Sequence, residues 1–341
     1  MLSSLTEAPP TTVSAAHPAN PWRKALAPYA TPRLDRGVVD LATSIVPYLL
    51  LAAAMVALAP VSPLLTLALA LPAAGFLLRT FIVFHDCAHG SFLPSKRANQ
   101  WLGRVLGVVV YTPFGAWRHS HAMHHASAGD LDRRGHGDVL TMTVAEYHAA
   151  SRVRRLAYRL IRHPAVMFTL GPFVAMALLP RLTTPSARPR IRNSVVLNDL
   201  VLAIAIAAFC VVLGWQTFLL VQVPIVALAG GAGVWLFFVQ HQFEDVYWES
   251  AEEWSYADAA LRGSSYLRLP KLLQFFSGNI GLHHVHHLSA RIPNYNLQAA
   301  HDDNDVFHSV PQLTLWQGIR ATRLKLWDEH AHRLVTFAQA R

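Results

Sequence analysis

Cysteine and charge are both scarce in this chain. Of its 341 residues only 2 are cysteine, Cys87 and Cys210, and 14% are charged. So few cysteines exclude a disulfide framework, a zinc finger and a four-cysteine iron-sulfur cluster. The chain also has no CxxCH haem-attachment motif and no GxGxxG dinucleotide-binding motif after a strand. It therefore carries no recognisable electron-transfer group of its own, and a redox reaction here would need a separate carrier.

Apolar residues, in contrast, make up 53% of the chain and are gathered into long blocks. A bilayer core of about 30 Å needs roughly 20 residues of helix at 1.5 Å per residue. The blocks that meet this length lie near 39–59, 62–84, 195–213 and 217–239. We therefore predict four transmembrane helices.

A fifth apolar stretch, near 165–180, has about 16 residues with a Gly-Pro pair in its middle, which is short for a span. If it crossed the bilayer, the histidine motifs described below would face different compartments and could not share a site. We predict that this stretch lies in the interface or enters the membrane and returns.

Basic residues predict the orientation. The links between the first two and the last two spans contain no Lys or Arg, whereas arginines crowd the segment before the first span and the long central loop. The positive-inside rule then places both termini and the histidine motifs in the cytoplasm. The formal net charge of +9 is explained by this membrane surface. Nucleic-acid binding would require a basic soluble face with base-reading or stacking elements.

The ends of the chain differ from its middle. Residues 1–35 are rich in Ala, Pro, Ser and Thr without apolar periodicity, so we expect a mobile N-terminal tail. They have no continuous apolar core of the kind found in a secretory signal. We predict a single membrane domain over 36–320, followed by a C-terminal tail over 321–341.

Three histidine motifs, HDCAH, HAMHH and HHVHH, lie outside the apolar blocks. Imidazole is neutral near pH 7 and binds borderline transition metals. Two histidines four apart lie on one face of a helix, and HxxHH can direct two rings to one ion and the third to a neighbouring ion. A histidine-rich interfacial helix would not be expected to repeat this spacing. We interpret the motifs as a dinuclear metal site whose ligands are His85, His89, His121, His124, His125, His283, His286 and His287.

Other histidines lie near these motifs. His241, in QHQFED, stands where the fourth span meets the cytoplasm, and an ionisable residue at such a depth is a candidate ligand. His119 and His284 fall off the repeated spacing, so we expect them to support the ligands or to face solvent.

The three motifs, with two spans between the second and the third, resemble the histidine boxes of the membrane fatty acid desaturases. The segments GDLDRRGHGDVLTMTVAEY (129–147), FVQHQFEDVYWE (238–249) and SGNIGLHHVHHLSARIPNYNL (277–297) resemble bacterial acyl-lipid desaturases, including the delta-12 (omega-6) and delta-5 types. The resemblance covers roughly 38–320. It implies an all-α integral membrane protein of the bacterial cytoplasmic membrane, with four transmembrane helices under a cytosolic helical cap that holds two irons.

The resemblance also implies roles for individual residues. The eight box histidines become iron ligands, and His241 matches an additional histidine of the family. Some members have an asparagine four residues earlier that acts through a water; Phe237 stands there in this chain, so we expect a shell of nine imidazoles. Asp86, Glu244 and Asp245 are candidates for orienting the imidazoles. For Asp138 we favour a solvated charge.

The implied reaction removes two vicinal hydrogens from an acyl chain, consumes O2 and two electrons, and leaves a cis double bond. The electrons would come from a ferredoxin or a cytochrome b5-like protein, and the substrate would be an acyl chain of a membrane lipid in an apolar tunnel. We expect the small residues 229–233 to serve helix packing, and Trp117 to be an interfacial anchor.

Two other functions remain open. A di-iron hydroxylase of an alkane, carotenoid or lipid would use similar boxes, although LSARIPNYNL after the third box favours desaturation. A metal transporter would line its spans with His, Asp or Glu. The span centres lack such residues; Arg79 and Asp199 lie near helix ends, where an arginine can snorkel and an aspartate can cap a helix or meet headgroups.

Overall fold

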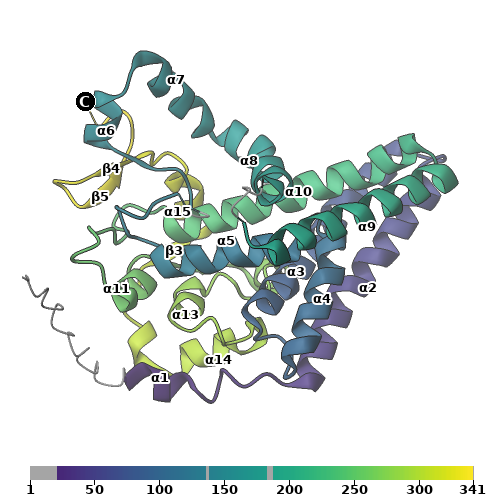
Figure 1. The fold of residues 1–341 in the computed structure, drawn as a ribbon, viewed down its shortest axis with the longest axis horizontal. Coiled ribbons are helices and arrows are strands. Elements are labelled where there is room, and N and C mark those ends of the chain that lie inside the picture. Colours follow the sequence, from purple (N-terminus) through teal and green to yellow (C-terminus); the bar gives the residue numbers. More distant parts are fainter. Residues whose placement is uncertain (1–20, 136–137, 183–186, 341) are drawn as a thin grey trace, which may run out of the picture.

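The computed structural model describes residues 21–135, 138–182 and 187–340. Its largest elements are four apolar helices of 25 or 27 residues. They are α2 (Leu34–Leu58), α3 (Pro63–His89), α9 (Pro189–Leu213) and α10 (Trp215–His241). Each is long and apolar enough to cross a bilayer, and together they form the extended right-hand part of the molecule in Figure 1. The four blocks predicted from the sequence are thus helical.

A fifth segment also meets the length and composition of a span. It runs over Pro164–Arg181 and is built from α8 (Pro164–Pro172), a π-helix η1 (Phe173–Leu178) and a short 3-10 turn η2 (Leu179–Arg181). The described residues therefore contain five candidate spans where we predicted four. The stretch expected at 165–180 is a helix of 18 residues whose middle changes to π geometry directly after Pro172.

The remaining elements are short, and most gather at one end of the long helices (Figure 1). The helices are α1 (Pro21–Leu26), α4 (Lys96–Val109), α5 (Phe114–Ser127), α6 (Val144–Ala149), α7 (Arg152–Ile161), α11 (Tyr256–Leu261), α12 (Lys271–Phe276), α13 (His283–Leu288), α14 (Leu297–Asp302) and α15 (Leu315–Ala321), with 3-10 turns η3 (Asn294–Asn296) and η4 (Asp305–Phe307).

Strands are few and short. β1 (Met142–Thr143) pairs in parallel with β4 (Leu326–Asp328), which pairs antiparallel with β5 (Arg333–Val335). β2 (Tyr266–Arg268) and β3 (Gln312–Thr314) form a second, parallel pair. The prediction of a C-terminal tail over 321–341 is therefore wrong for the described residues, because β4 and β5 pack into the body and bury Trp327 and Leu334.

The N-terminal segment also differs from the prediction. Residues 1–20 of the expected tail lie outside the described residues. From Pro21 onward the chain packs on the body: Leu26 is buried, the Trp22 ring stacks on Tyr256, and the Tyr29 hydroxyl donates to Asp303 at 2.7 Å. Apolar and aromatic side chains with partners far along the chain give this segment a fixed place despite its weak periodicity.

Helix α3 connects the membrane part to the histidines. The Ser62 side chain caps its first turn by accepting from the Leu65 N–H at 3.3 Å, and the helix ends at Gly90, whose φ of 69° favours glycine. Between these ends the helix passes its predicted limit near residue 84 without a break. His85 and His89 therefore share one helical face at its end.

Two charges assigned to helix ends have partners instead. Arg79 does not snorkel toward headgroups; it is 9% exposed and forms an ion pair with Asp40 of α2. Asp199 pairs with Arg181 of η2 at 2.9 Å and is not a helix cap. Both partners are distant in sequence, so periodicity gave no indication of them.

Candidate metal centre

Four helices bring nine histidines together. α3 and α10 contribute side chains from their last turns, while the short helices α5 and α13 each contribute one HxxHH motif. Helical spacing puts the rings of each motif toward the middle of these four elements. Every histidine predicted as a ligand is among the nine.

The histidines form two groups, and within each group one ligand atom per residue lies within 4.8 Å of all the others. The first group holds five residues: His85, His89, His121, His125 and His286. The second holds four: His124, His241, His283 and His287. Each HxxHH motif is thus divided between the groups, as its spacing predicted.

The nitrogens face one another with spacings typical of shared binding. The Nε2 atoms of His121 and His125 are 3.1 Å apart, and those of His125 and His286 are 3.0 Å apart. In the second group the Nε2 atom of His241 is 3.2 Å from that of His124 and 2.9 Å from that of His283. One ring cannot direct a hydrogen at every such neighbour, whereas a central cation accepts all their lone pairs.

Several buried ring nitrogens have no hydrogen-bond partner. In the two groups these include the Nε2 atoms of His89 and His287, which a bound ion would give a partner. The Nδ1 atoms of His125, His283 and His286 are also unpaired, but these three rings face their neighbours through Nε2. Native proteins leave few buried polar atoms unpaired, so each such atom needs an explanation. Imidazole donors in sets of five and four fit two borderline transition-metal ions.

The electrostatics also suit a metal. Burial, reinforced by neighbouring histidines, lowers the pKa of His121, His125, His283, His286 and His287 well below the ordinary histidine value. These rings are therefore neutral at physiological pH. Metal coordination requires neutral imidazole, so no proton has to be displaced from these residues.

One carboxylate contacts each group. Asp86 Oδ1 lies 3.0 Å from His85 Nδ1, and Asp138 Oδ1 lies 2.6 Å from His124 Nδ1. Such contacts fix the tautomer and the orientation of a ligating ring. Asp86 was a predicted candidate. Our preference for Asp138 as a solvated charge is wrong, since its side chain is only 12% exposed and faces the ring.

Other predicted supports do not reach the site. Glu244 and Asp245 are exposed beyond the end of α10, and Glu244 faces Arg333 at 3.4 Å. Of the two off-spacing histidines, His119 is exposed and His284 is buried with its Nε2 3.0 Å from His301 Nδ1. Neither belongs to a metal-binding group.

Two aromatic side chains cover the histidines. Trp117 stacks on His121 with 4.4 Å between ring centroids and an interplanar angle of 20°. It is therefore part of the site, not only an interfacial anchor as predicted. Phe237 lies 5.0 Å from His124 and 5.4 Å from His241, centroid to centroid, and offers no ligand atom.

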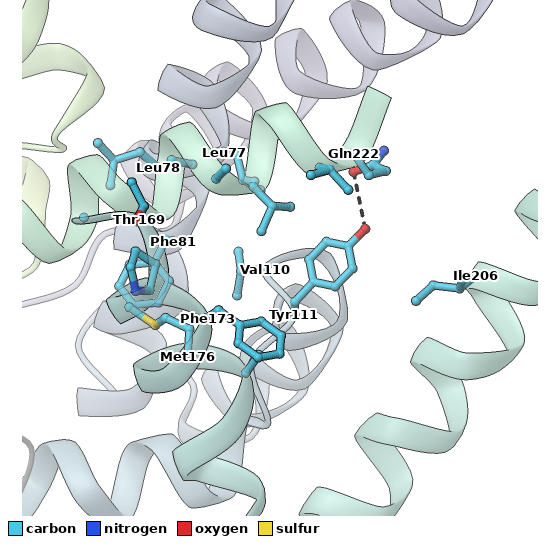
Figure 2. Close-up of a pocket in the computed structure, with 18 of the residues that line it drawn as sticks. Leu77, Leu78, Phe81, Val110, Tyr111, Thr169, Phe173, Met176, Ile206 and Gln222 are labelled. Carbon is cyan, nitrogen blue, oxygen red and sulfur yellow. Dashed lines mark hydrogen bonds between the residues drawn. The ribbon is translucent and has the colours of Figure 1, made fainter. Parts of the chain in front are cut away.

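An apolar cavity of about 410 Å³ opens beside this aromatic cover. Phe81, which lines it, packs edge-on against Trp117 at 5.4 Å. Figure 2 shows Leu77, Leu78 and Phe81 on one side, Phe173 and Met176 on another, and Ile206 across the gap. The Tyr111 hydroxyl, like that of Tyr48, donates to Gln222 Oε1.

The glycines beside the cavity show close helix packing. A Cβ at Gly230 would lie 2.8 Å from Pro172, and one at Gly231 would lie 2.8 Å from the Phe168 carbonyl oxygen. The expected packing role is thus confirmed for these two residues, against α8. Gly230 and Gly233 also line the cavity.

The sequence profile and the relatives that match this chain all carry the name desaturase. Residues 60–315 match the sequence profile described as fatty acid desaturase. A Bacillus subtilis protein named fatty acid desaturase is 46% identical over 94% of this chain and 92% of its own length. Two Synechocystis proteins, named sn-1 oleoyl-lipid 12-desaturase and sn-1 acyl-lipid omega-3 desaturase (ferredoxin), are 28% and 30% identical. The matches cover 65% and 64% of this chain but only 63% and 62% of those proteins.

Proposed function

This chain belongs to the fatty acid desaturase family, whose members are oxidoreductases, and we propose that it introduces a cis double bond into acyl chains of membrane lipids, as a delta-12 or omega-6 type enzyme, at a centre of two iron ions. The observation that carries the proposal is the pair of histidine groups, five and four residues with their nitrogens within 4.8 Å. The named activities of the Synechocystis relatives favour acyl-lipid substrates.

The histidine groups would each hold one iron ion. Bound iron supplies the reduction of O2 to an oxidant able to remove hydrogen from an unactivated methylene, which no amino-acid side chain can do. Overall, the acyl chain loses two hydrogens, O2 takes these with two protons and two electrons, and two water molecules leave. Burial keeps the rings of the five histidines with lowered pKa neutral. Asp86 and Asp138 orient the rings that they contact, and Trp117 and Phe237 exclude water.

The apolar cavity is the proposed acyl site. It follows α10 from Gly233 to Phe218, which is about 22 Å at 1.5 Å per residue. Its inner end, at Phe81, is one helical turn from His85 on α3. Since its walls belong to apolar helices that lie in the bilayer, a lipid acyl chain reaches it without passing through water, which favours membrane lipids over soluble substrates.

We also propose that only four of the five candidate spans cross the membrane, under a cytosolic helical cap. His124 precedes Pro164–Arg181, α9 and α10, and His241 follows them, yet their Nε2 atoms are 3.2 Å apart. Three crossings would separate these atoms by a bilayer, whereas two keep them on one side. Pro164–Arg181 then lies in the interface or enters the membrane and returns. The positive-inside rule favours a cytoplasmic site and cytoplasmic termini in a bacterial inner membrane.

The proposed electron source is a separate protein, a ferredoxin or a cytochrome b5-like carrier. The support is the absence of haem-attachment, dinucleotide-binding and four-cysteine iron-sulfur motifs from the sequence. The name of one relative includes ferredoxin as well.

The proposal is tested by product analysis. A host that makes only saturated and monounsaturated chains would express the wild type, His121→Ala or His286→Ala, and mass spectrometry would locate new double bonds in the lipids. We expect new cis double bonds with the wild type alone, and less iron per purified chain in both variants. A hydroxylated product would replace the proposal with oxygenation, and full activity of either variant would remove the ligand assignment.

A further inference from the structure

A chain of buried polar contacts extends from His85 into the packing between α2 and α3. Asp86, which contacts His85 Nδ1 through Oδ1, accepts at Oδ2 a hydrogen bond of 2.6 Å from the Asn294 backbone N–H. The Asn294 side-chain amide donates to Asp40 Oδ2 at 2.9 Å. Asp40 in turn forms an ion pair with Arg79. The contacts therefore connect the first two long helices with the segment that follows the third histidine motif.

These polar groups are almost completely removed from solvent. The exposed fractions are 9% for Arg79, 6% for Asp40 and 2% for Asn294. A buried ion pair recovers little free energy beyond its desolvation cost, and apolar residues of similar volume often stabilise a protein equally well. Stability alone is thus a weak reason for this network.

Its geometry points to a second role. Asn294 uses its backbone N–H to hold Asp86 and its side chain to hold Asp40, and its carbonyl accepts from Asn279 Nδ2 at 3.1 Å. Arg79 has a second hydrogen-bond partner besides Asp40, because it also donates to the Phe275 carbonyl. The place of the Asp86 carboxylate therefore depends on residues in three separate parts of the chain.

The contact with Asp86 decides which nitrogen of His85 serves a metal. An ionised Asp86 requires the proton on Nδ1, which leaves the Nε2 lone pair for the ion. The adjacent rings also constrain His85: its centroid lies 4.4 Å from that of His286 and 4.8 Å from that of His121. A small rotation of His85 would move Nε2 away from the other donors of the first group.

We propose that Asp40, Arg79 and Asn294 are positioning residues of the first histidine group: they hold Asp86 in place and, through it, orient His85 toward the metal. The inference rests on the proposed di-iron centre. It assigns to an ion pair between two membrane helices a role in metal binding.

The test measures metal directly. The full-length protein in nanodiscs would be loaded with ferrous iron, and iron per chain, iron retention against a chelator and the Mössbauer spectrum would be recorded. For Asp40→Asn and for Asn294→Ala we expect retention of one of the two ions to fall by about 10-fold to 100-fold, with a changed spectrum for that ion alone. Arg79→Lys keeps a positive charge beside Asp40, so this variant should retain much more iron than Asp40→Asn.

A matched control is available in the second membrane-boundary ion pair. Asp199→Asn breaks the 2.9 Å contact with Arg181 between η2 and α9. The other hydrogen bonds described for Arg181 go to the carbonyls of Tyr111 and Ala177 and not to a histidine. The Asp199→Asn variant should retain both ions as the wild type does, with an unchanged Mössbauer spectrum for each. An equal loss in this control would show a general effect of helix packing and overturn the inference.

The remaining outcomes separate this inference from the proposed function. A wild type that binds no iron removes both. A wild type with two ions, together with Asp40→Asn and Asn294→Ala variants of unchanged retention and spectrum, overturns only the positioning role. If Asp40→Asn does not insert into membranes, Asn294→Ala decides, because it leaves the ion pair with Arg79 in place.

Discussion

Filling the apolar cavity near its inner end should stop desaturation without removing the metal. Gly233 of α10 lines the cavity, and a Cβ built there would meet Leu78 Cδ1 at 3.6 Å, an ordinary van der Waals contact. Alanine therefore fits, and it should stabilise the helix by up to about 1 kcal/mol relative to glycine. The further carbons of a leucine would project into the space beside Phe81 that we assign to the acyl chain.

The size of the effect follows from the shape of the site. A mismatch of one methylene in an apolar pocket changes specificity by roughly 1–3 kcal/mol, or 10-fold to 200-fold. Gly233→Leu adds three carbons beyond the tolerated Cβ, so we expect desaturation to fall by at least about 100-fold. Gly233→Ala should remain active. Iron per chain should stay at the wild-type value in both, because the nearest proposed ligand on α10 is His241, two helical turns away.

The assay combines fatty-acid profiles of the expressing host with iron analysis of the purified protein. Ala232→Leu is the matched control, since it adds an apolar side chain to the neighbouring, exposed position of the same helix. It should keep full activity. Wild-type product from Gly233→Leu would show that the acyl chain binds elsewhere, and an equal loss in Ala232→Leu would show that added bulk on α10 is itself harmful.

Further predictions concern the metal groups and pH. His283→Ala should remove the iron of the second group and roughly halve the iron per chain, because His283 belongs to that group alone; two retained ions would contradict the grouping. Asp138→Asn should weaken iron retention by about 10-fold to 100-fold, measured by chelator competition, whereas an unchanged value would make its 2.6 Å contact with His124 incidental. Burial lowers the pKa of Lys325 from 10.5 to about 8, so between these values the unfolded state binds more protons and the free energy of unfolding rises with pH. Lys325→Met should reduce the rise in unfolding temperature between pH 8 and 10, and an equal rise in both proteins would refute this account.

Local periodicity explains what could be predicted from the sequence. The long apolar blocks and the repeated HxxHH spacing depend on residues within one or two helical turns, and both reappear as helices and as divided ligand sets. The histidine four residues after His85 lies on the same face for the same reason. His241 was found from its position at the end of an apolar block.

Contacts between distant parts of the chain were not visible in the same way. Asp138 follows HAMHH in a segment without helical periodicity, so no spacing rule connects it to His124. The pairing of Arg79 with Asp40 joins two helices, and the strands formed by residues 326–335 are too short to be recognised before their partners are known. The acidic residues near His241 were poor candidates for a geometric reason: α10 ends there, and the chain turns Glu244 toward Arg333.

Helix α3 brings residues that line the cavity within one helical turn of histidines of the candidate metal centre. Leu77, Leu78 and Phe81 of this helix line the cavity, and one turn after Phe81 the same helix provides His85 of the first histidine group. α10 repeats the arrangement with Gly233 at the cavity and His241 in the second group. Because a helix rises only about 5.4 Å per turn, the proposed acyl site and the two histidine groups lie close together. Under the proposed function, the acyl chain would remain in an apolar environment up to Phe81 and Trp117, directly beside the histidines.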